Sequence, residues 1–300
     1  GNNSITIKWG NGATGTVSVT VTNPAASGGC SATVSTNVAI EDPTPPTITC
    51  PANVTVNANT GLCYATGVNL GTPVINDNDT CGRASVTNDA PATFPIGNTT
   101  VIWTVKDYKD NKATCTQTVT VTDNQFPVIS CPSNIIVNNA TGTCGAVVNY
   151  ATPVGTDNCS GVITTQTAGM ASGSTFPVGT TTNTFTVTDA SNNTTSCSFT
   201  ITVNDTQAPT IICPVPINTT TNTACTATGV ALGTPTTADN CSFVSVTNNA
   251  PAAFPIGTTT VTWTVTDVAG NTASCTTQTV TVTDATPPTI ACPSNITTTT

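Results

Sequence analysis

Residues 123–197 read DNQFPVISCPSNIIVNNATGTCGAVVNYATPVGTDNCSGVITTQTAGMASGSTFPVGTTTNTFTVTDASNNTTSC. The landmarks of this segment are Asp, Cys-Pro, Cys, Thr-Pro, Asp-Asn, Cys, Phe-Pro-(Ile/Val)-Gly, an aromatic residue, Asp and Cys, and most of them recur upstream and downstream. The Cys-Pro pairs give the period, since 131 − 50 = 81, 213 − 131 = 82 and 292 − 213 = 79. A fixed long period indicates one repeated unit. A unit of about 80 residues can hold a small core of its own, so it is a domain and not a solenoid repeat.

The composition is polar but weakly charged. Only 6% of the 300 residues are charged and 37% are hydrophobic, whereas a typical domain has about 25% charged residues. The net charge of −9, from 5 Lys+Arg and 14 Asp+Glu, opposes binding to nucleic acid or anionic lipid. No run approaches the roughly 18 apolar residues of a membrane helix, so no membrane insertion is expected in this segment.

Alternation of Thr with Val or Ile predicts half-buried strands, and no stretch has helical periodicity. Strands are expected in the first complete repeat at residues 48–56, 63–70, 84–87, 99–105 and 114–122. Many short strands separated by regular turn signals indicate an all-β fold made of tandem β-sandwich domains in a linear array.

The period divides the chain into five segments. Residues 1–41 are expected to form the C-terminal part of a preceding β-sandwich domain, with strands at 4–9, 16–22 and 30–40. Residues 284–300 are expected to form the first strand of a further repeat. The complete repeats, named repeats 1, 2 and 3, are expected at 42–122, 123–204 and 205–283. The incomplete ends suggest a window on a longer polypeptide.

Fourteen cysteines and no histidine are present, with four cysteines in each complete repeat and one in each flanking segment. Zinc sites use Cys-x2-Cys pairs or histidine, but the closest cysteines here are 12 or 13 residues apart. The set therefore predicts disulfides, and with them an extracellular or cell-surface location. Four cysteines allow three connectivities, so spacing leaves the pairing open.

The repeated motifs resemble the hyalin repeat (HYR), a module with an immunoglobulin-like fold. They are the Asp-x7-Cys-Pro opening, Asp-Asn-Cys, Phe-Pro-(Ile/Val)-Gly and Thr-Asp-x3-Asn, and they cover residues 42–283 three times. The resemblance implies tandem immunoglobulin-like domains that act as adhesive or structural spacers in extracellular proteins and are not enzymes. The Thr/Asn-rich, Lys-poor composition also resembles large surface proteins of Bacteroidetes-type bacteria.

In an immunoglobulin-like sandwich the first strand can lie beside the last and run parallel to it, so the first and last cysteines of a repeat can meet. The resemblance supports this choice through HYR members that keep only the first and last cysteines, and it leaves the middle pair to each other. The expected bonds are Cys50–Cys115, Cys63–Cys81, Cys131–Cys197, Cys144–Cys159, Cys213–Cys275 and Cys225–Cys241. For the two remaining cysteines, either each bonds a cysteine outside this sequence, or Cys292 of one chain bonds Cys30 of the next, head to tail.

Ten of the fourteen acidic residues fall at three recurring positions, namely the linkers, the loop between the second and third strands, and the loop before the last strand. One interpretation is that these aspartates cap turns. The other is that they bind calcium at domain junctions, because calcium takes six to eight oxygen ligands. The candidate ligands are Asp42, Asp77 and Asp107; Asp123, Asp157 and Asp189; and Asp205, Asp239 and Asp267.

No recognisable active site is present. The chain has no histidine, no Gly-x-Ser-x-Gly motif and no phosphate-binding loop, so an enzyme is not expected. The expected function is an extracellular structural protein, a disulfide-stapled stalk or filament whose partners are further domains of the same chain or copies of itself. The alternative is a cell-surface adhesin that binds glycans or partner proteins through exposed loops. The aromatic residues expected in the cores, or alternatively in a sugar-stacking platform, are Trp103, Phe185 and Trp263.

Overall fold

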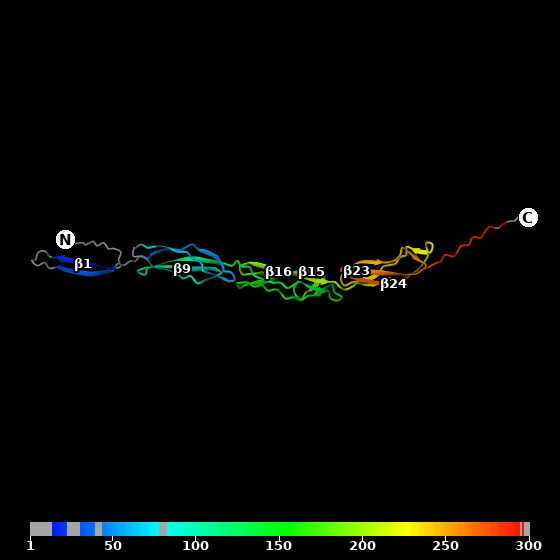
Figure 1. Ribbon diagram of the computed structural model, residues 1–300, viewed down its shortest axis with the longest axis horizontal. Helices are drawn as coiled ribbons and strands as arrows, with labels where there is room; N and C mark the ends of the chain where they lie inside the picture. The colour runs from blue at the N-terminus through cyan, green and yellow to red at the C-terminus, as the bar shows by residue number, and fades with distance from the viewer. Residues whose placement is uncertain (1–13, 23–30, 40–43, 78–82, 295, 297–300) are drawn as a thin grey trace. The chain divides into compact units, whose positions relative to one another are not determined.

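The computed structural model describes residues 14–22, 31–39, 44–77, 83–294 and 296. The secondary structure of these residues consists of strands and turns, which confirms the expected all-β fold (Figure 1). In this part of the chain, no helix is long and apolar enough to cross a membrane. The described chain forms two compact units. One holds the chain up to Val128 with Thr156–Ile163 and Thr188–Thr195, and the other holds Ile129–Gly155, Thr164–Val187 and the chain from Ser196 onward.

The N-terminal segment contains an antiparallel hairpin of β1 (Thr14–Thr22) and β2 (Ser31–Ala39). Two of the three strands expected before residue 42 are therefore present, with shifted ends. The third, at residues 4–9, lies outside the described residues, as does Cys30.

The described part of repeat 1 contains eight strands in three sheets. A four-stranded sheet has the order β4-β10-β9-β7, and two-stranded sheets pair β3 with β6 and β5 with β8. The strands are β3 (Thr47–Thr49), β4 (Val54–Asn57), β5 (Tyr64–Thr66), β6 (Val74–Asn76), β7 (Arg83–Asn88), β8 (Thr93–Pro95), β9 (Gly97–Asp107) and β10 (Lys112–Thr122).

Repeats 2 and 3 follow the same plan, with four-stranded sheets β11-β16-β15-β13 and β18-β24-β23-β21. The neighbouring strands β15 and β16 and the antiparallel pair β23–β24 are labelled in Figure 1. The strands of repeat 2 are β11 (Ile135–Asn138), β12 (Gly145–Val147), β13 (Ile163–Ala168), β14 (Thr175–Pro177), β15 (Gly179–Thr188) and β16 (Thr194–Asn204). Those of repeat 3 are β17 (Thr210–Ile212), β18 (Ile217–Thr220), β19 (Thr226–Thr228), β20 (Thr236–Ala238), β21 (Phe243–Asn248), β22 (Ala253–Pro255), β23 (Gly257–Asp267) and β24 (Thr272–Thr283).

The first strand of a repeat is not the single strand that the sequence predicts at 48–56. It is divided into β3 and β4 around Pro51, because proline has no N–H to donate to a sheet. The first half pairs with β6, and the second half runs parallel to β10 with Val54 opposite Val119. The predicted parallel neighbourhood of the first and last strands is thus confirmed, and the division lets one strand serve two sheets.

Each repeat has its own core cluster. Alternation along β9 buries Val101, Trp103 and Val105, with 0%, 7% and 0% exposure, while the residues between them face outward. Burying one such apolar side chain contributes about 1.5–3 kcal/mol. The aromatic residues predicted in the cores, Trp103, Phe185 and Trp263, are buried.

Candidate functional site

Among the residues that the structure describes, three disulfides lie within single repeats and confirm the predicted pairing of first and last cysteines. Their Cα atoms are 5.6 to 5.7 Å apart, within the ordinary range for a disulfide. The bonds are Cys50–Cys115, Cys131–Cys197 and Cys213–Cys275.

The prediction for the middle cysteines is wrong. Cys63 bonds Cys159 with Cα atoms 4.9 Å apart, and Cys144 bonds Cys241 with Cα atoms 4.8 Å apart. The second cysteine of one repeat therefore bonds the third cysteine of the next. The bonds that the structure contradicts are Cys63–Cys81, Cys144–Cys159 and Cys225–Cys241. Cys81 and Cys30 lie outside the described residues, and Cys225 and Cys292 are free and exposed.

The physical reason is visible in repeat 3, where the two middle cysteines lie at opposite ends of β24. Cys225 follows Thr221, whose N–H donates to the carbonyl of Thr283 at the C-terminal end of β24. Cys241 precedes Ser242, whose carbonyl accepts the N–H of Val268 in the turn before β24 begins. A strand of twelve residues spans about 36 Å, whereas a disulfide needs Cα atoms about 4.4–6.8 Å apart. The middle cysteines of repeat 3 therefore cannot meet.

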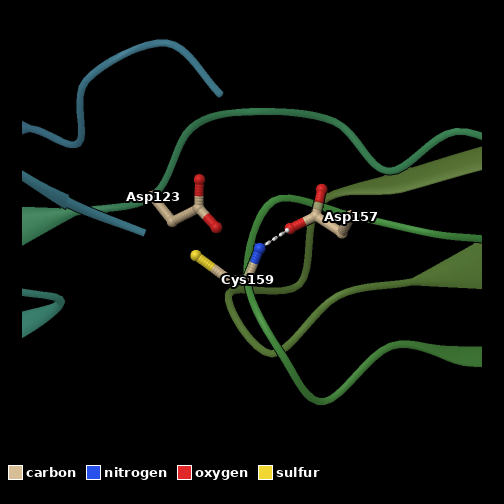
Figure 2. Close-up of side chains that lie close together, drawn as sticks. All are labelled: Asp123, Asp157 and Cys159. Carbon is tan, nitrogen blue, oxygen red and sulfur yellow. Dashed lines mark hydrogen bonds between the residues drawn. The ribbon is translucent and has the colours of Figure 1, made fainter. Parts of the chain in front are cut away.

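The Asp-Asn-Cys loop that joins repeat 2 to repeat 1 makes three kinds of contact. Asp157 accepts the N–H of Cys159 at 2.9 Å, which shapes the loop (Figure 2). Asn158 Nδ2 donates to the carbonyl of Leu62 at 3.0 Å, and Cys159 bonds the adjacent Cys63. We call residues 157–159 a joint loop. Its aspartate shapes the loop, and its asparagine and cysteine bind the preceding repeat.

The second joint loop repeats the same contacts between repeats 3 and 2. Asp239 accepts the N–H of Cys241 at 3.0 Å, and Asn240 Nδ2 donates to the carbonyl of Thr143 at 3.2 Å. Thr143 precedes Cys144, as Leu62 precedes Cys63. Two independent occurrences show that the joint is a property of the repeat.

A glutamine pins each of the two linkers between complete repeats onto the turn that carries the second cysteine. Gln125 accepts the N–H of Gly61, and its Nε2 donates to the carbonyls of Asn59 and Leu62 at 3.2 and 3.3 Å. In the next linker, the side chain of Gln207 accepts the N–H of a glycine in the equivalent turn at 2.7 Å. The sequence reasoning missed these residues, although both stand two positions after a linker aspartate.

The acidic residues gather at the same joints. Carboxylate oxygens of Asp205, Asp239 and Asp267 lie within 4.8 Å of one another, which is the predicted third set. At the earlier joint Asp123 and Asp157 lie together with Cys159 (Figure 2). The Cys159 sulfur is committed to a disulfide and cannot serve as a thiolate ligand.

The remaining predicted ligands are placed differently. Asp189 is not in the group with Asp123, but Asn193 Nδ2 bridges its Oδ2 to the backbone carbonyl of Asp123, at 2.8 and 3.2 Å. Asp42 lies outside the described residues. Neither oxygen of Asp77 has a hydrogen-bond partner in the described chain.

One linker aspartate and two joint-loop aspartates cap turns with one oxygen and leave the other without a partner among the described residues. Oδ1 of Asp123 accepts the N–H of Gln125 at 3.1 Å, while its buried Oδ2 has no partner among the described residues. Asp157 and Asp239 likewise use Oδ2 for the cap and leave a buried Oδ1 unpaired. Unpaired buried carboxylate oxygens are costly, and oxygen atoms of this kind suit a hard cation such as calcium.

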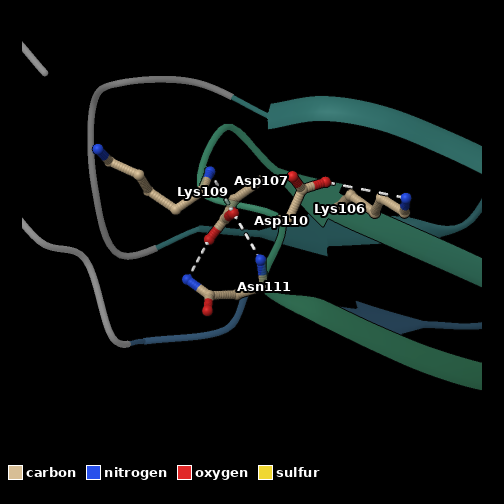
Figure 3. A network of polar contacts seen from close by, with 5 residues as sticks. All are labelled: Lys106, Asp107, Lys109, Asp110 and Asn111. Atoms are coloured by element: carbon tan, nitrogen blue, oxygen red, sulfur yellow. Dashed lines mark hydrogen bonds and ion pairs between the residues drawn. The ribbon is translucent and has the colours of Figure 1, made fainter.

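Asp107 fixes the β9–β10 turn of repeat 1 (Figure 3). The side chain is 3% exposed, and it accepts the N–H groups of Lys109 and Asn111 at 2.7 and 2.9 Å and Asn111 Nδ2 at 2.7 Å. Desolvation acts to raise the pKa of Asp107, but these hydrogen bonds, led by the side chain of Asn111, outweigh it and the pKa is lowered. The Lys106–Asp110 ion pair at 3.9 Å is exposed and contributes little.

These features define a class of protein: disulfide-bonded β-sandwich modules in tandem, with an extracellular structural or adhesive role and no enzymatic one. The chain belongs to the HYR domain family, whose model matches residues 41–121, 122–203 and 204–282. The five disulfides of the described residues fit the oxidising extracellular or cell-surface location of such proteins.

Two relatives are proteins named hyalin. The one from Strongylocentrotus purpuratus is 36% identical over 273 residues, which cover 86% of this chain and 22% of that protein. The one from Lytechinus variegatus is 33% identical over 258 residues, covering 80% and 47%. The chain thus spans less than half the length of either relative. The bacterial origin suggested by composition stays a prediction.

Two further similarities are more limited. A serine-rich adhesin for platelets from Staphylococcus aureus is 31% identical over 173 residues, which cover 49% of this chain and 7% of that protein. Among solved structures, the protocadherin GammaB4 extracellular domain aligns with 90% of this chain and 55% of its own length, at 15% identity and a TM-score of 0.37.

Proposed function

We propose that this chain is a structural segment of an extracellular stalk or filament, in which each HYR repeat is covalently locked to the next. We further propose repeat boundaries at 42–122, 123–204 and 205–283, with 1–41 and 284–300 belonging to neighbouring domains. The observation that carries the proposal is the pair of bonds Cys63–Cys159 and Cys144–Cys241.

These two bonds complete a series of overlapping closed loops. The loops run 50–115, 63–159, 131–197, 144–241 and 213–275, and each begins before the previous one ends. Every peptide bond between Cys50 and Cys275 therefore lies inside at least one loop. The linkers 116–130 and 198–212 are enclosed only by the joint disulfides. A spacer exposed to proteases benefits from this arrangement, because one cleavage does not sever it.

A single cut in the first linker tests the proposal. We expect a chain with a site-specific protease sequence inserted between Phe126 and Pro127 to stay in one piece after cleavage on a non-reducing gel. With reductant it should separate into two fragments, because among the described cysteines Cys63–Cys159 is the only covalent connection left across the cut.

The matched control removes one joint at a time. The double variant Cys63→Ser with Cys159→Ser should release two fragments without reductant, whereas Cys144→Ser with Cys241→Ser should not. If the cut chain separates without reductant while all its cysteines are present, covalent locking of the repeats is refuted.

We also propose that calcium binds at the joints, with Asp205, Asp239 and Asp267 as carboxylate ligands of one site. The oxygens lie within 4.8 Å of one another, and the buried Oδ1 of Asp239 lacks a partner among the described residues. Without a cation, carboxylates this close repel one another. When bound, the cation supplies compensating positive charge and brings the linker and two loops of repeat 3 together.

The variant Asp239→Asn gives a sharp test, because its amide oxygen can still accept the N–H of Cys241. We expect calorimetric titration to find one bound calcium fewer per chain, and a smaller rise of Tm with calcium. In chelator the variant should be at least as stable as the parent, because one repelling charge is gone. The control Asp110→Asn removes an exposed charge (85% exposed) and should leave the calcium response unchanged. A parent chain whose Tm is the same in calcium and in chelator would refute the site.

An adhesin that binds glycans or a partner surface is a second candidate. The observation in its favour is Tyr108, which is 66% exposed in the β9–β10 turn of repeat 1 beside Lys109. Repeats 2 and 3 have Ala190 and Val268 at that position. On a glycan array we expect Tyr108→Ala to abolish any specific signal and Val268→Ala to preserve it. An array without signal for the parent chain would count against glycan binding.

A further inference from the structure

Repeat 3 presents a second cysteine whose partner is missing. Cys225 is free and exposed, whereas its equivalents Cys63 and Cys144 are both bonded to the third cysteine of the repeat that follows. The register is fixed by Ala65, Ala146 and Ala227, each of which stands two residues after the second cysteine. Within one molecule, the same position is thus seen bonded twice and free once.

A hollow lies beside Cys225, at the place where the joint loop sits in the other two repeats. It has a volume of about 460 Å³ and is lined by residues 221–224, Asp284 and residues 286–289. In repeat 1 the corresponding turn and linker receive the loop that contains Asn158, whose amide bonds the carbonyl of Leu62. The hollow is therefore bounded by the same two segments that hold a joint loop elsewhere.

The carboxylate of Asp284 makes the same backbone contact as the linker aspartates of the two joints described above. Its Oδ1 accepts the N–H of Thr286 at 2.9 Å, as Asp123 and Asp205 accept the N–H two residues ahead at 3.1 Å. The linker aspartate at each formed joint also lies next to the joint-loop aspartate. The position of Asp284 thus supplies the linker half of a third acidic cluster.

We propose that Cys225, the turn 221–224 and Asp284 form the receptor for the Asp-Asn-Cys joint loop of the repeat that opens at Cys292-Pro293. The incoming cysteine forms a disulfide with Cys225, and the preceding asparagine donates its amide to the carbonyl of Ala224, which is equivalent to Leu62. The inference rests on the proposed function, because it takes successive repeats to be covalently joined.

Bond formation at this receptor balances as an ordinary thiol oxidation. The two thiols lose two electrons and two protons as the sulfur–sulfur bond forms. These reduce one small-molecule disulfide, such as oxidised glutathione, to two thiols. Because the joints already formed enclose 96 and 97 residues of sequence separation, an equivalent bond should stabilise the joined state by a loop-closure effect of similar size.

The receptor of repeat 3 differs from the other two in its noncovalent contacts. Its turn is one residue shorter, because the N–H of Asn222 donates to a carbonyl four residues ahead, whereas the N–H of Asn59 donates to one five residues ahead. In addition, Thr286 stands where Gln125 and Gln207 pin the earlier linkers. The glutamine contacts are therefore lost, and this joint depends more on its disulfide than the other two do.

The test uses a longer chain, in which the repeat that begins at Cys292 is completed with sequence from repeat 3. Because Cys292 corresponds to Cys213, a copy of residues 222–283 is attached after Thr300, with Cys225→Ser in the attached copy only. After oxidation with oxidised glutathione, we expect alkylation and peptide mapping to show Cys225 bonded to the attached copy of Cys241. In the original chain, which lacks this copy, Cys225 should be alkylated.

The matched control carries Cys241→Ser in the attached copy and should make Cys225 reactive to alkylation again. A Cys225 that stays reactive in the completed chain, or that bonds Cys292, would overturn the inference. Dimers of the original chain linked through Cys225 would also overturn it, because the loop would then come from a second copy. The same map reports Cys63–Cys159 and Cys144–Cys241, so loss of those bonds would mark failure of the proposed function instead.

Discussion

At the scale of single residues, the carboxylate of Asp107 makes the stability of repeat 1 depend on pH. Its pKa in the folded chain lies below the ordinary value, which is about 3.9 for aspartate. Its stabilising contribution is therefore complete above that value and is lost as pH falls through the lower, folded-state pKa.

We expect Asp107→Asn to lower the thermal stability of repeat 1 at neutral pH and to lose less stability than the parent between neutral pH and strong acid. The reason is that the amide cannot keep all three hydrogen bonds to Lys109 and Asn111, and it carries no charge to titrate. Calorimetric melts across pH 2 to 7 measure the difference, with exposed Asp110→Asn as the control. Parallel pH profiles for Asp107→Asn and the parent would contradict this role.

Another residue-scale feature is a buried pairing that differs between repeats. Trp103 Nε1 donates to Gln117 Oε1 at 3.0 Å, and Trp263 Nε1 donates to Gln278 Oε1 at 2.6 Å. Repeat 2 has Phe185 and Phe199 there instead, stacked with ring centroids 6.4 Å apart. The glutamine accompanies the indole because a buried N–H needs an acceptor. Alternation along the strand predicts the buried aromatic residue, but no sequence motif marks the glutamine that accepts its N–H.

At the scale of elements, the Phe-Pro-x-Gly turn before the long strands is a sequence motif with a backbone reason. Gly97, Gly179 and Gly257 have φ angles of 100°, 110° and 110°, a region that side chains with a Cβ rarely adopt. A Cβ at each of them would meet no atom within 4 Å, so the backbone angle alone requires glycine.

We therefore expect Gly97→Ala to destabilise repeat 1 by about 1–2 kcal/mol, with the same cost for Gly257→Ala in repeat 3. Chemical denaturation of the oxidised chain measures both. Gly155→Ala is an informative comparison, because its Cβ would collide with the side chain of Val187 and should cost more. A neutral Gly97→Ala would show that the turn relaxes to a different conformation.

Some features of the strands and disulfides could be predicted from the sequence and others could not. Thr-Val alternation predicted the long strands, and the immunoglobulin-like resemblance predicted the parallel first and last strands with their disulfide. The resemblance leaves the middle cysteines to each other only when the four cysteines of one repeat are considered alone. Their places at opposite ends of β24 follow from strand lengths, which spacing does not reveal. The acidic clusters were predicted in part, because Asp189 reaches Asp123 only through Asn193.

At the scale of the whole molecule, the disulfides limit how far the chain can be pulled. In the reduced chain, the 225 residues from Cys50 to Cys275 (275 − 50) can extend to roughly 750 Å at about 3.4 Å per residue. With the bonds closed, the shortest covalent path from Cys50 to Cys275 crosses each repeat through its within-repeat disulfide. The peptide segments of this path are the linkers 116–130 and 198–212, which together extend to roughly 100 Å.

We expect single-molecule pulling from the termini to show this large gain in length only after reductant is added. The joint variants Cys63→Ser with Cys159→Ser should keep the short length, because the shortest path uses the within-repeat bonds. An oxidised chain that extends as far as the reduced one would contradict the connectivity.

The overlapping loops also impose an order on biosynthesis. Cys50 can close with Cys115 as soon as its own repeat has emerged, but Cys63 must wait for Cys159, 96 residues later. In a growing chain, the second cysteine of the most recently synthesised repeat is therefore still unbonded. The next repeat supplies the third cysteine that bonds it. The cellular machinery that oxidises this protein has to leave that thiol reduced until the following repeat has folded.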